Sequence, residues 1–266
     1  MTCEAEIRES NYHFREAWQL FARISPGGAT FDQDGLSFAN RNHPWFFMNL
    51  GFLNRPAVND SDVEGRATEA VKYFGVSNHA WLFTASEDWL GPNASSVLSK
   101  FGLVRKLDFT GMVAERLRPP ARSCPQNVQL CRIIDEQTRT DLADLNADAY
   151  CVPREWARRV VSSAVLWESP LFGAVAYVEG EPASAAFAVP IDKALYVAWV
   201  ATSKTHRRLG FAELVIRASL EDARKATGIE RAILHATEDG LPVYLRMGYR
   251  SVAKFPLYGS GEKDDR

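Results

Sequence analysis

The residues from 171 to 202 constrain the fold more than any other part of the chain. Three apolar segments, 171–178, 183–189 and 194–202, follow one another with only short polar connections. The connection Glu179-Gly180-Glu181 is typical of a β-hairpin. The third segment is apolar almost throughout, as in a strand whose two faces are both buried. We therefore expect a sheet with residues 194–202 near its centre.

Helical periodicity after these strands predicts a mixed α/β fold. Residues 210–226 place Phe211, Val215 and Ala218 on one face of a helix, and Gly228 is a typical stop signal. The other elements expected in this part are strands at 128–134, 231–236 and 249–257 and helices at 138–150, from 153 onward and at 241–247. Because this order mixes hairpins with crossovers, we expect a mixed, twisted sheet with helices on both faces.

The segment Arg116–Asn127 divides the chain. It contains Pro119, Pro120 and Pro125 and has no apolar period, so neither a helix nor a central strand can run through it. We predict a first domain at 1–118, a proline-rich linker at 119–127 and a second domain at 128–266.

The first domain is expected to contain similar elements. Helices are predicted around 14–21, at 61–74 with a capping box formed by Ser61 and Glu64, and at 92–101, and strands near 36–39, 45–53, 80–84 and 103–113. The order strand, helix, strand at 80–113 also occurs near the end of the second domain. Phe101-Gly102-Leu103 then corresponds to Met247-Gly248-Tyr249. This repetition favours a diverged duplication over chance similarity.

Charge and composition exclude several classes of protein. The chain has 31 Lys and Arg against 33 Asp and Glu, and a net charge of −2 argues against binding nucleic acid through bulk charge, although a local basic patch is compatible with it. No apolar stretch reaches the ~20 residues of a membrane-spanning helix, and the charged N-terminus lacks a signal peptide's apolar run. The four cysteines include no Cys-x-x-Cys pair, which disfavours structural zinc. We therefore expect a cytoplasmic protein with reduced thiols, no metal, no membrane and no nucleic-acid partner.

Residues 199–213 carry the strongest chemical signal. A strand is expected to end near Thr202, a short polar loop follows, and a helix begins near Gly210. A helix N-terminus binds phosphate through its unpaired N–H groups and its positive dipole end. Gly210 permits close approach of the backbone, and Arg207 and Arg208 add positive charge. The alternative is an ordinary strand-to-helix turn with two solvated arginines.

This loop resembles the coenzyme A pyrophosphate loop of the GNAT superfamily of acyl-CoA-dependent N-acyltransferases. The signature of that family, (Arg/Gln)-x-x-Gly-x-(Gly/Ala), is matched by Arg207, Gly210 and Ala212. A second signature, a helix that ends in Tyr-x-x-x-Gly-(Phe/Tyr), is matched by residues 244–249. The two motifs lie at the separation found in the family, and the resemblance covers residues 128–258.

The first domain resembles the family less closely. Only residues 81–113 are similar to the C-terminal part of a GNAT domain, and no Arg-x-x-Gly-x-Ala loop precedes them. The resemblance therefore implies two related GNAT-like domains in tandem, of which the first is degenerate and does not hold coenzyme A in the same way.

The resemblance also implies where acetyl-CoA binds. In the family, the thioester lies where two neighbouring parallel strands splay apart, which would be 194–202 and 231–236 here. The backbone of Trp199, Val200 and Ala201 would then pair with the pantetheine arm. The residues around the pyrophosphate would be Arg207, Arg208, Leu209, Gly210, Phe211, Ala212 and Glu213.

In members of this family, the amine attacks the thioester directly. Tyr244 matches their general acid, which protonates the leaving thiolate, and the alternative is a tyrosine that only packs one face of a short helix. Residues 194–202 contain no carboxylate, so the candidates for the base are Glu238, Asp239 and His235. Each of these also has a structural interpretation, the two acids at a helix N-terminus and the histidine as a buried imidazole.

The function implied by the resemblance is an N-acetyltransferase. It would move an acetyl group from acetyl-CoA to the primary amine of a small molecule, an amino acid or a peptide, by direct attack in a ternary complex. A monomer or a homodimer is expected. The alternative is a non-catalytic GNAT-fold protein that senses acyl-CoA or binds a partner protein.

Overall fold

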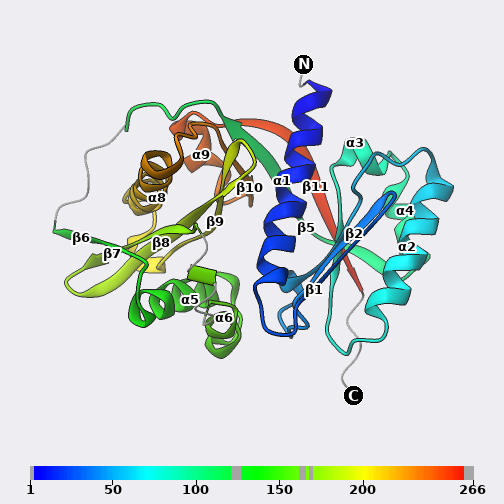
Figure 1. Cartoon of the computed structure of the whole chain (residues 1–266), viewed down its shortest axis with the longest axis horizontal. Helices are drawn as coiled ribbons and strands as arrows, with labels where there is room; N and C mark the ends of the chain where they lie inside the picture. Colours follow the sequence, from blue (N-terminus) through cyan, green and yellow to red (C-terminus); the bar gives the residue numbers. More distant parts are fainter. Residues whose placement is uncertain (1–2, 121–126, 162–165, 168–169, 261–266) are drawn as a thin grey trace. The chain divides into compact units, whose positions relative to one another are not determined.

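The computed structural model describes residues 3–120, 127–161, 166–167 and 170–260, and Figure 1 shows their helices and strands. The contacts within the chain divide it into two compact units. Unit 1 consists of Met1–Gly111, His235–Glu238 and Ser251–Arg266, and unit 2 of Met112–Leu234 and Asp239–Arg250. The domain boundaries expected from the sequence stay a prediction, and residues 121–126 of the expected linker lie outside the described residues.

The sheet of unit 1 incorporates the last strand of the chain. Its strand order is β1-β2-β3-β4-β11-β5. These strands are β1 (Ala29–Gln33), β2 (Leu36–Asn40), β3 (Asn49–Phe52), β4 (Leu82–Thr84), β5 (Leu103–Ala114) and β11 (Arg250–Ser260). Strands β3 and β4 are parallel, whereas β2 runs antiparallel to β1 and β3, and β11 antiparallel to β4. Strand β11 therefore lies between two strands from the first half of the chain.

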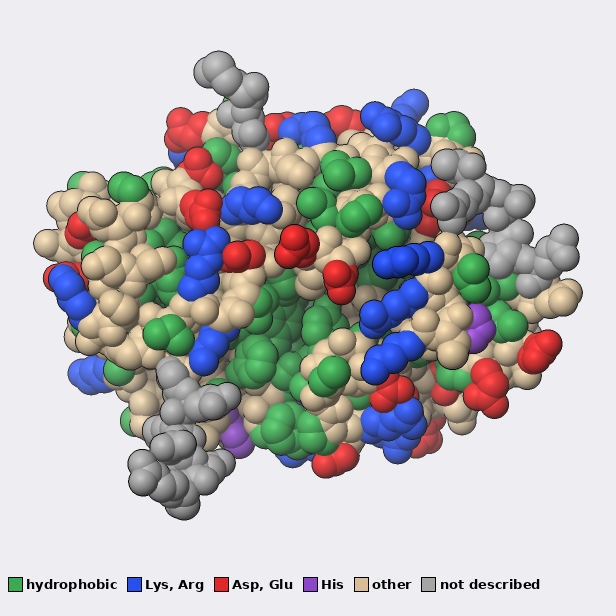
Figure 2. All heavy atoms as spheres, turned by 180° about the vertical axis from the view of Figure 1, so that it is seen from behind, with side chains coloured by type: hydrophobic (Ala, Val, Ile, Leu, Met, Phe, Trp, Pro, Cys, Tyr) green, Lys and Arg blue, Asp and Glu red, His purple; other side chains and the backbone are tan. Residues whose placement is uncertain are grey.

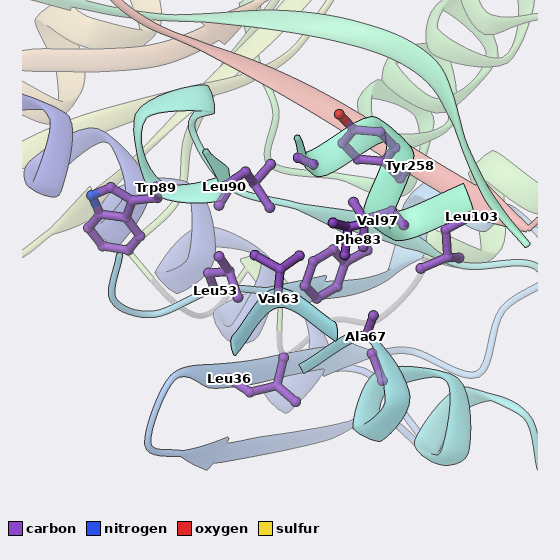
Figure 3. Packing of buried hydrophobic residues seen from close by; sticks show 14 of the residues in the cluster. Leu36, Leu53, Val63, Ala67, Phe83, Trp89, Leu90, Val97, Leu103 and Tyr258 are labelled. Carbon is purple, nitrogen blue, oxygen red and sulfur yellow. The ribbon is translucent and has the colours of Figure 1, made fainter. Parts of the chain in front are cut away.

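Helices cover both faces of this sheet (Figure 1). The helices are α1 (Glu4–Arg23), the short turn η1 (Phe46–Met48), α2 (Asp60–Phe74), α3 (Glu87–Leu90) and α4 (Ala94–Ser99). On one face, Phe14 of α1 contacts the rings of Phe52 and Phe255 with centroid distances of 5.3 and 5.8 Å. On the other, Val63 of α2 and Val97 of α4 belong with Phe83 to the hydrophobic cluster shown in Figure 3.

Unit 2 is built around the strands that the apolar segments predict. Its strand order is β10-β9-β8-β7-β6, where β6 to β9 pair antiparallel and β9 pairs parallel with β10. These strands are β6 (Val128–Arg132), β7 (Phe172–Val178), β8 (Glu181–Ile191), β9 (Ala194–Thr202) and β10 (Ala232–Ala236). The expected hairpins are confirmed, and residues 194–202 form an interior strand of this sheet.

The helices of unit 2 lie on both sides of its sheet (Figure 1). They are α5 (Glu136–Tyr150), α6 (Arg154–Val161), the short turn η2 (Lys204–His206), α8 (Phe211–Thr227) and α9 (Leu241–Met247). Helices α5 and α6 are on one side and α8 is on the other. The expected fold class, a mixed α/β sheet with helices on both faces, is confirmed.

The capping box expected at the start of α2 is wrong. The helix begins at Asp60, and Asn59 is its N-cap, with an Oδ1 that accepts a hydrogen bond of 3.0 Å from the amide of Asp62. Asparagine caps as well as serine, and its position before the helix lets it reach the third amide. Ser61 is therefore inside the helix rather than at its boundary. The sequence analysis also missed β1 and the short helix α3.

Among the described residues, no helix is long and apolar enough to cross a membrane.

Removing the ring of Phe83 should destabilise unit 1. This side chain is fully buried between β4 and the helices α2 and α4. We expect Phe83→Ala to lower the free energy of unfolding by about 3–5 kcal/mol, because apolar burial is lost and a cavity is left. Urea denaturation measures this change. The control is Val76→Ala, at a site that is 91% exposed, which should stay within about 0.5 kcal/mol of the wild type. Equal stability of the two variants would contradict the observed packing.

Candidate functional site

Strand β9 carries a β-bulge at Trp199 and Val200. Its register with β8 pairs Ala198 with Phe187 and Ala201 with Ala185, so two residues of β9 face one residue of β8. Trp199 has a φ of +56°, in the left-handed region that bulges use and bulky side chains otherwise avoid. The bulge lies within the three residues expected to contact the pantetheine arm.

Beyond its first residues, β9 separates from β10. The parallel pairing consists of Leu195 with Ala232 and Tyr196 with Ile233, preceded by a hydrogen bond of 2.8 Å from the Leu195 amide to the carbonyl of Arg231. Strand β9 continues to Thr202 without a further pair to β10. Among the described residues, the two strands thus form no ladder beyond Tyr196, and an extended amide chain can bind beside such a strand in the manner of an added strand.

The corresponding strands of unit 1 do not separate. Strand β4 pairs with β3 along its whole length, through Leu82, Phe83 and Thr84. A further hydrogen bond of 3.2 Å joins the amide of Leu53 to the carbonyl of Thr84 and extends this pairing past the end of β3. Because these backbone groups already have partners, unit 1 offers no such edge between its parallel strands.

The loop after β9 leads into a helix N-terminus with free amides. Gly210 is the N-cap of α8 with a φ of +94°, and the amide of Leu214 makes the first helical hydrogen bond, to the carbonyl of Gly210. The amides of Phe211, Ala212 and Glu213 precede this bond at the helix end, a position at which anions commonly bind in proteins. A Cβ placed on Gly210 would have no atom within 4 Å, so the space beside the backbone here is open.

Positive charge lies next to these amides. Arg207 and Arg208 are exposed, and Arg207 Nε lies 3.5 Å from the carbonyl oxygen of Thr202 at the end of β9. Leu209 is also exposed. On the face seen in Figure 2, Lys and Arg side chains form a column, while acidic and basic side chains are interspersed over the rest of it. A near-neutral chain thus still presents local positive charge.

The carboxylate of Glu213 is paired within its own helix. It forms an ion pair with Arg217 one turn later in α8, at 2.7 Å, and its side chain is 15% exposed. Arg217 also donates a hydrogen bond of 2.6 Å to the carbonyl of Arg118. Because its charge is compensated within the helix, Glu213 can contribute its backbone amide to an anion site without repelling the anion.

Tyr244 lies in α9 and its side chain is buried. Its ring meets that of Tyr249 edge to face, with centroids 5.8 Å apart. Burial raises the pKa of the Tyr244 hydroxyl, and the neighbouring Tyr150 raises it further. The phenol therefore keeps its proton at neutral pH, as a general acid must.

The candidate bases lie in different surroundings. His235 belongs to unit 1, where its ring stacks on Phe14 at 4.2 Å and meets Phe255 edge to face, and its Nε2 lies 3.2 Å from Ser10 Oγ. Burial lowers the pKa of His235, and His13 lowers it further. Glu238 is exposed in unit 1, and Asp239 is exposed in unit 2. The assignment of any of them as the base stays a prediction.

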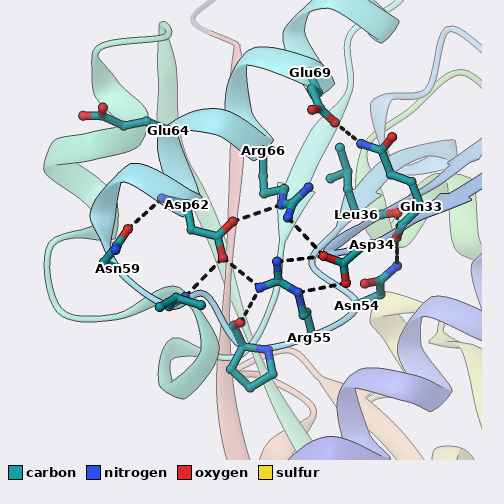
Figure 4. Close-up of polar contacts among 12 residues, drawn as sticks. Gln33, Asp34, Leu36, Asn54, Arg55, Asn59, Asp62, Glu64, Arg66 and Glu69 are labelled. Carbon is teal, nitrogen blue, oxygen red and sulfur yellow. Dashed lines mark hydrogen bonds and ion pairs between the residues drawn. The ribbon is translucent and has the colours of Figure 1, made fainter.

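In unit 1, the counterpart of the phosphate loop is closed by its own side chains. Asp62, in the first turn of α2, accepts hydrogen bonds of 3.1 Å from the amide of Val58 and 2.8 Å from Arg55. Arg55 also binds Asp34, as Figure 4 shows. The hydrogen bond from Arg55 holds the pKa of Asp62 below its usual value, so this helix N-terminus carries its own carboxylate. The negative charge of Asp62 therefore disfavours a phosphate at this helix N-terminus.

Asn146 is a site residue that the sequence did not lead us to expect. This residue of α5 is 1% exposed, and its Nδ2 donates hydrogen bonds of 2.9 Å to the carbonyl of Leu142 and 3.1 Å to that of Trp199. The signal was a polar residue on the face of the predicted helix that otherwise carries Leu142 and Leu145. Asn146 thus ties α5 to the bulge of β9.

The comparisons with known proteins concern the family and the fold of the chain. Residues 136–249 match the acetyltransferase (GNAT) family. The solved structure of a GCN5-related N-acetyltransferase from Kribbella flavida superposes with a TM-score of 0.70 at 18% identity, over 95% of this chain and 97% of that one. A tandem GNAT protein from the clavulanic acid biosynthesis pathway superposes with a TM-score of 0.57 at 13% identity, over 86% of this chain and 79% of that one. No curated protein matches the chain. The expected GNAT-like fold is thereby confirmed.

Alanine at Gly210 should destabilise unit 2 for a conformational reason alone. The space around a new Cβ is open, but the φ of +94° is unfavourable for any other residue. We expect Gly210→Ala to lower the free energy of unfolding by about 1–2 kcal/mol in urea titrations. Gly65→Ala is the matched control, because this site is also open but lies inside α2, where alanine should raise stability by about 0.5–1 kcal/mol. A neutral or stabilising Gly210→Ala would disprove the left-handed cap.

Proposed function

We propose that this chain, whose residues 136–249 match the acetyltransferase (GNAT) family, is an N-acetyltransferase that acts on a primary amine. The observation that carries the proposal is the arrangement of unit 2. There, the part of β9 that no longer pairs with β10 leads into a loop and a helix N-terminus that no side chain caps. A long ligand with an amide-containing arm and a phosphate group matches both features, and acetyl-CoA is such a ligand.

The residues present fit acetyl-CoA. Its pyrophosphate would be held by the amides of Phe211, Ala212 and Glu213, beside the glycine where a Cβ finds no neighbour. Arg207 and Arg208 would add positive charge, and the chain from Arg207 through Leu209 to Gly210 would form the wall of the loop. The backbone of Trp199, Val200 and Ala201 would pair with the pantetheine arm. When bound, acetyl-CoA supplies an activated acetyl group as a thioester.

The protein's own part in the reaction is orientation and proton transfer. The amine attacks the thioester directly, so no nucleophilic side chain is needed. Tyr244 would donate its proton to the leaving thiolate. Of the candidate bases, Glu238 is exposed, whereas the His235 ring packs between two phenylalanines and has a lowered pKa. Protonation of His235 is therefore unfavourable, which supports Glu238, the likewise exposed Asp239 or a water molecule as the group that takes the proton from the amine.

The second candidate function is binding without turnover. It is favoured by one observation, the absence of a carboxylate on β9, where a base would adjoin the thioester. The two functions are separated by measuring thiol release from acetyl-CoA in the presence of a panel of small primary amines, amino acids and short peptides. Amine-dependent release supports the transferase, whereas coenzyme A binding without release supports a sensor or an interaction module.

Glutamate at Gly210 should abolish coenzyme A binding. The substitution adds bulk and a negative charge beside the amides of α8 that would hold the pyrophosphate. We expect wild-type protein to bind one coenzyme A per chain in calorimetry, because unit 1 offers no second site, and Gly210→Glu to weaken binding at least about 100-fold. Gly65→Glu adds the same group to an open site in α2 and should bind normally. Unchanged affinity of a folded Gly210→Glu variant, or two coenzyme A per chain, would refute this assignment.

Removing the hydroxyl of Tyr244 should slow the reaction. General acid catalysis contributes about 10²–10⁴-fold, so kcat of Tyr244→Phe should fall in that range while KM for acetyl-CoA changes little. The deficit should shrink with acyl donors whose leaving thiol is more acidic. Because burial raises the pKa of Tyr244, its acid form persists above neutral pH, and kcat should not decline through this group below about pH 10.

Tyr249→Phe is the control for this measurement. Tyr249 is also a buried tyrosine of unit 2, and its hydroxyl has no hydrogen-bond partner among the described residues. Its removal should leave kcat near the wild-type value. Near-normal kcat in both variants would show that Tyr244 only packs.

A further inference from the structure

Asn146 is a buried side chain with one half of its amide unsatisfied. Both hydrogen bonds of its Nδ2, to Leu142 and to Trp199, go to carbonyl oxygens. The nitrogen must therefore face these partners, and this fixes the orientation of the amide. Among the residues that the structure describes, none donates a hydrogen bond to the Oδ1 of Asn146. A buried acceptor in this condition is rare in folded proteins and points to a ligand or an ordered water molecule.

The position of this oxygen is defined by its neighbours. Oδ1 and Nδ2 are bonded to the same carbon atom, and Nδ2 lies 3.1 Å from the carbonyl oxygen of Trp199. Oδ1 is therefore beside the bulge, on the part of β9 that no longer pairs with β10. Tyr177 and Asp141, also on this side of the sheet, already hydrogen-bond each other at 2.6 Å. The free acceptor of Asn146 is thus distinct from this satisfied pair.

We propose that the Oδ1 of Asn146 accepts a hydrogen bond from the N–H of the acceptor amine, while its Nδ2 holds the Trp199 carbonyl in the bulge. The inference rests on the proposed function and names the residue that positions the amine. In the attack, the C–N bond forms and the C–S bond breaks. The sulfur takes the electron pair and the proton of Tyr244, and the surplus proton of the amine goes to the base.

A neutral amide oxygen suits this task better than a carboxylate. Only the free amine has the lone pair that attacks the thioester. A carboxylate at the same position would stabilise the ammonium form and raise its pKa, which lowers the fraction of free amine at a given pH. An amide oxygen accepts the N–H of the free amine without this penalty. The absence of a carboxylate on β9 is consistent with the same requirement.

Two variants separate the oxygen from the nitrogen of Asn146. Asn146→Ala and Asn146→Asp both lose the Nδ2 hydrogen bonds, but only the aspartate keeps an oxygen at the Oδ1 position. If the loss of Nδ2 changes KM for acetyl-CoA, this change should therefore be equal in Asn146→Ala and Asn146→Asp. We expect KM for the amine to rise about tenfold in Asn146→Ala, and to be several-fold lower in Asn146→Asp than in Asn146→Ala. The measurement uses the full chain and the best amine of the panel.

Ser219→Ala is the matched control. Ser219 is likewise 1% exposed on a helix, and its hydroxyl donates to the carbonyls of Val215 one turn earlier and Ala186 of a strand, at 2.8 and 3.1 Å. Its loss should leave KM for the amine unchanged. Thermal unfolding tests whether each variant is folded. If Asn146→Ala is not folded, Asn146→Ser takes its place, because serine retains a hydrogen-bond donor for the carbonyl of Leu142.

The outcomes decide the proposal. A lower KM for the amine in the aspartate variant than in the alanine or serine variant supports it. Equal KM values for the amine in these folded variants overturn it, because the oxygen then makes no contact with the amine. Absence of thiol release by wild-type protein with every amine overturns the proposed function itself, and this result is read from the wild type alone.

Discussion

Every buried backbone amide and carbonyl needs a hydrogen-bond partner, and the candidate site exists because β9 breaks its ladder with β10. The two strands pair only at Leu195 and Tyr196, and the bulge at Trp199 then turns the strand. Such a break is unfavourable unless something else satisfies the groups it frees. Asn146 satisfies the carbonyl of Trp199 from the neighbouring helix. The helix N-terminus of α8 follows this part of β9 after the short turn η2.

The two units show how similar elements lose or keep this property. In unit 1, the parallel strands β3 and β4 stay paired to the end, and at the start of α2 Asn59 accepts a hydrogen bond from the amide of Asp62, whose carboxylate binds Arg55. In unit 2, the strands separate and Gly210 leaves the helix start uncapped by a side chain. The difference depends on few residues. In α2 the side chain of Asn59 caps the amide of Asp62, whereas no side chain caps α8.

The parts of the structure that depend on local pattern could be predicted from the sequence. The helix over 211–227 and the strand over 194–202 follow from the spacing of apolar residues. The role of Gly210 at the helix start follows from its place just before the helix. The bulge could not, because it is a property of the register between two strands. Strand β1 was missed since its residues are exposed or half-buried and show no apolar alternation. Asn146 was hidden because a single polar residue on an apolar face does not reveal its partner.

The position of β11 also bears on how the chain folds. Its pairing brings Leu257 opposite Thr84, so the sheet of unit 1 includes a strand that is synthesised long after its neighbours. During translation, the strands of the first half emerge without the neighbour that separates β4 from β5. Contacts between such distant residues form late and slowly, because a long loop must close before they can stabilise anything. Unit 1, although its other strands come from the first half of the chain, therefore completes its sheet only after Arg250–Ser260 has been synthesised.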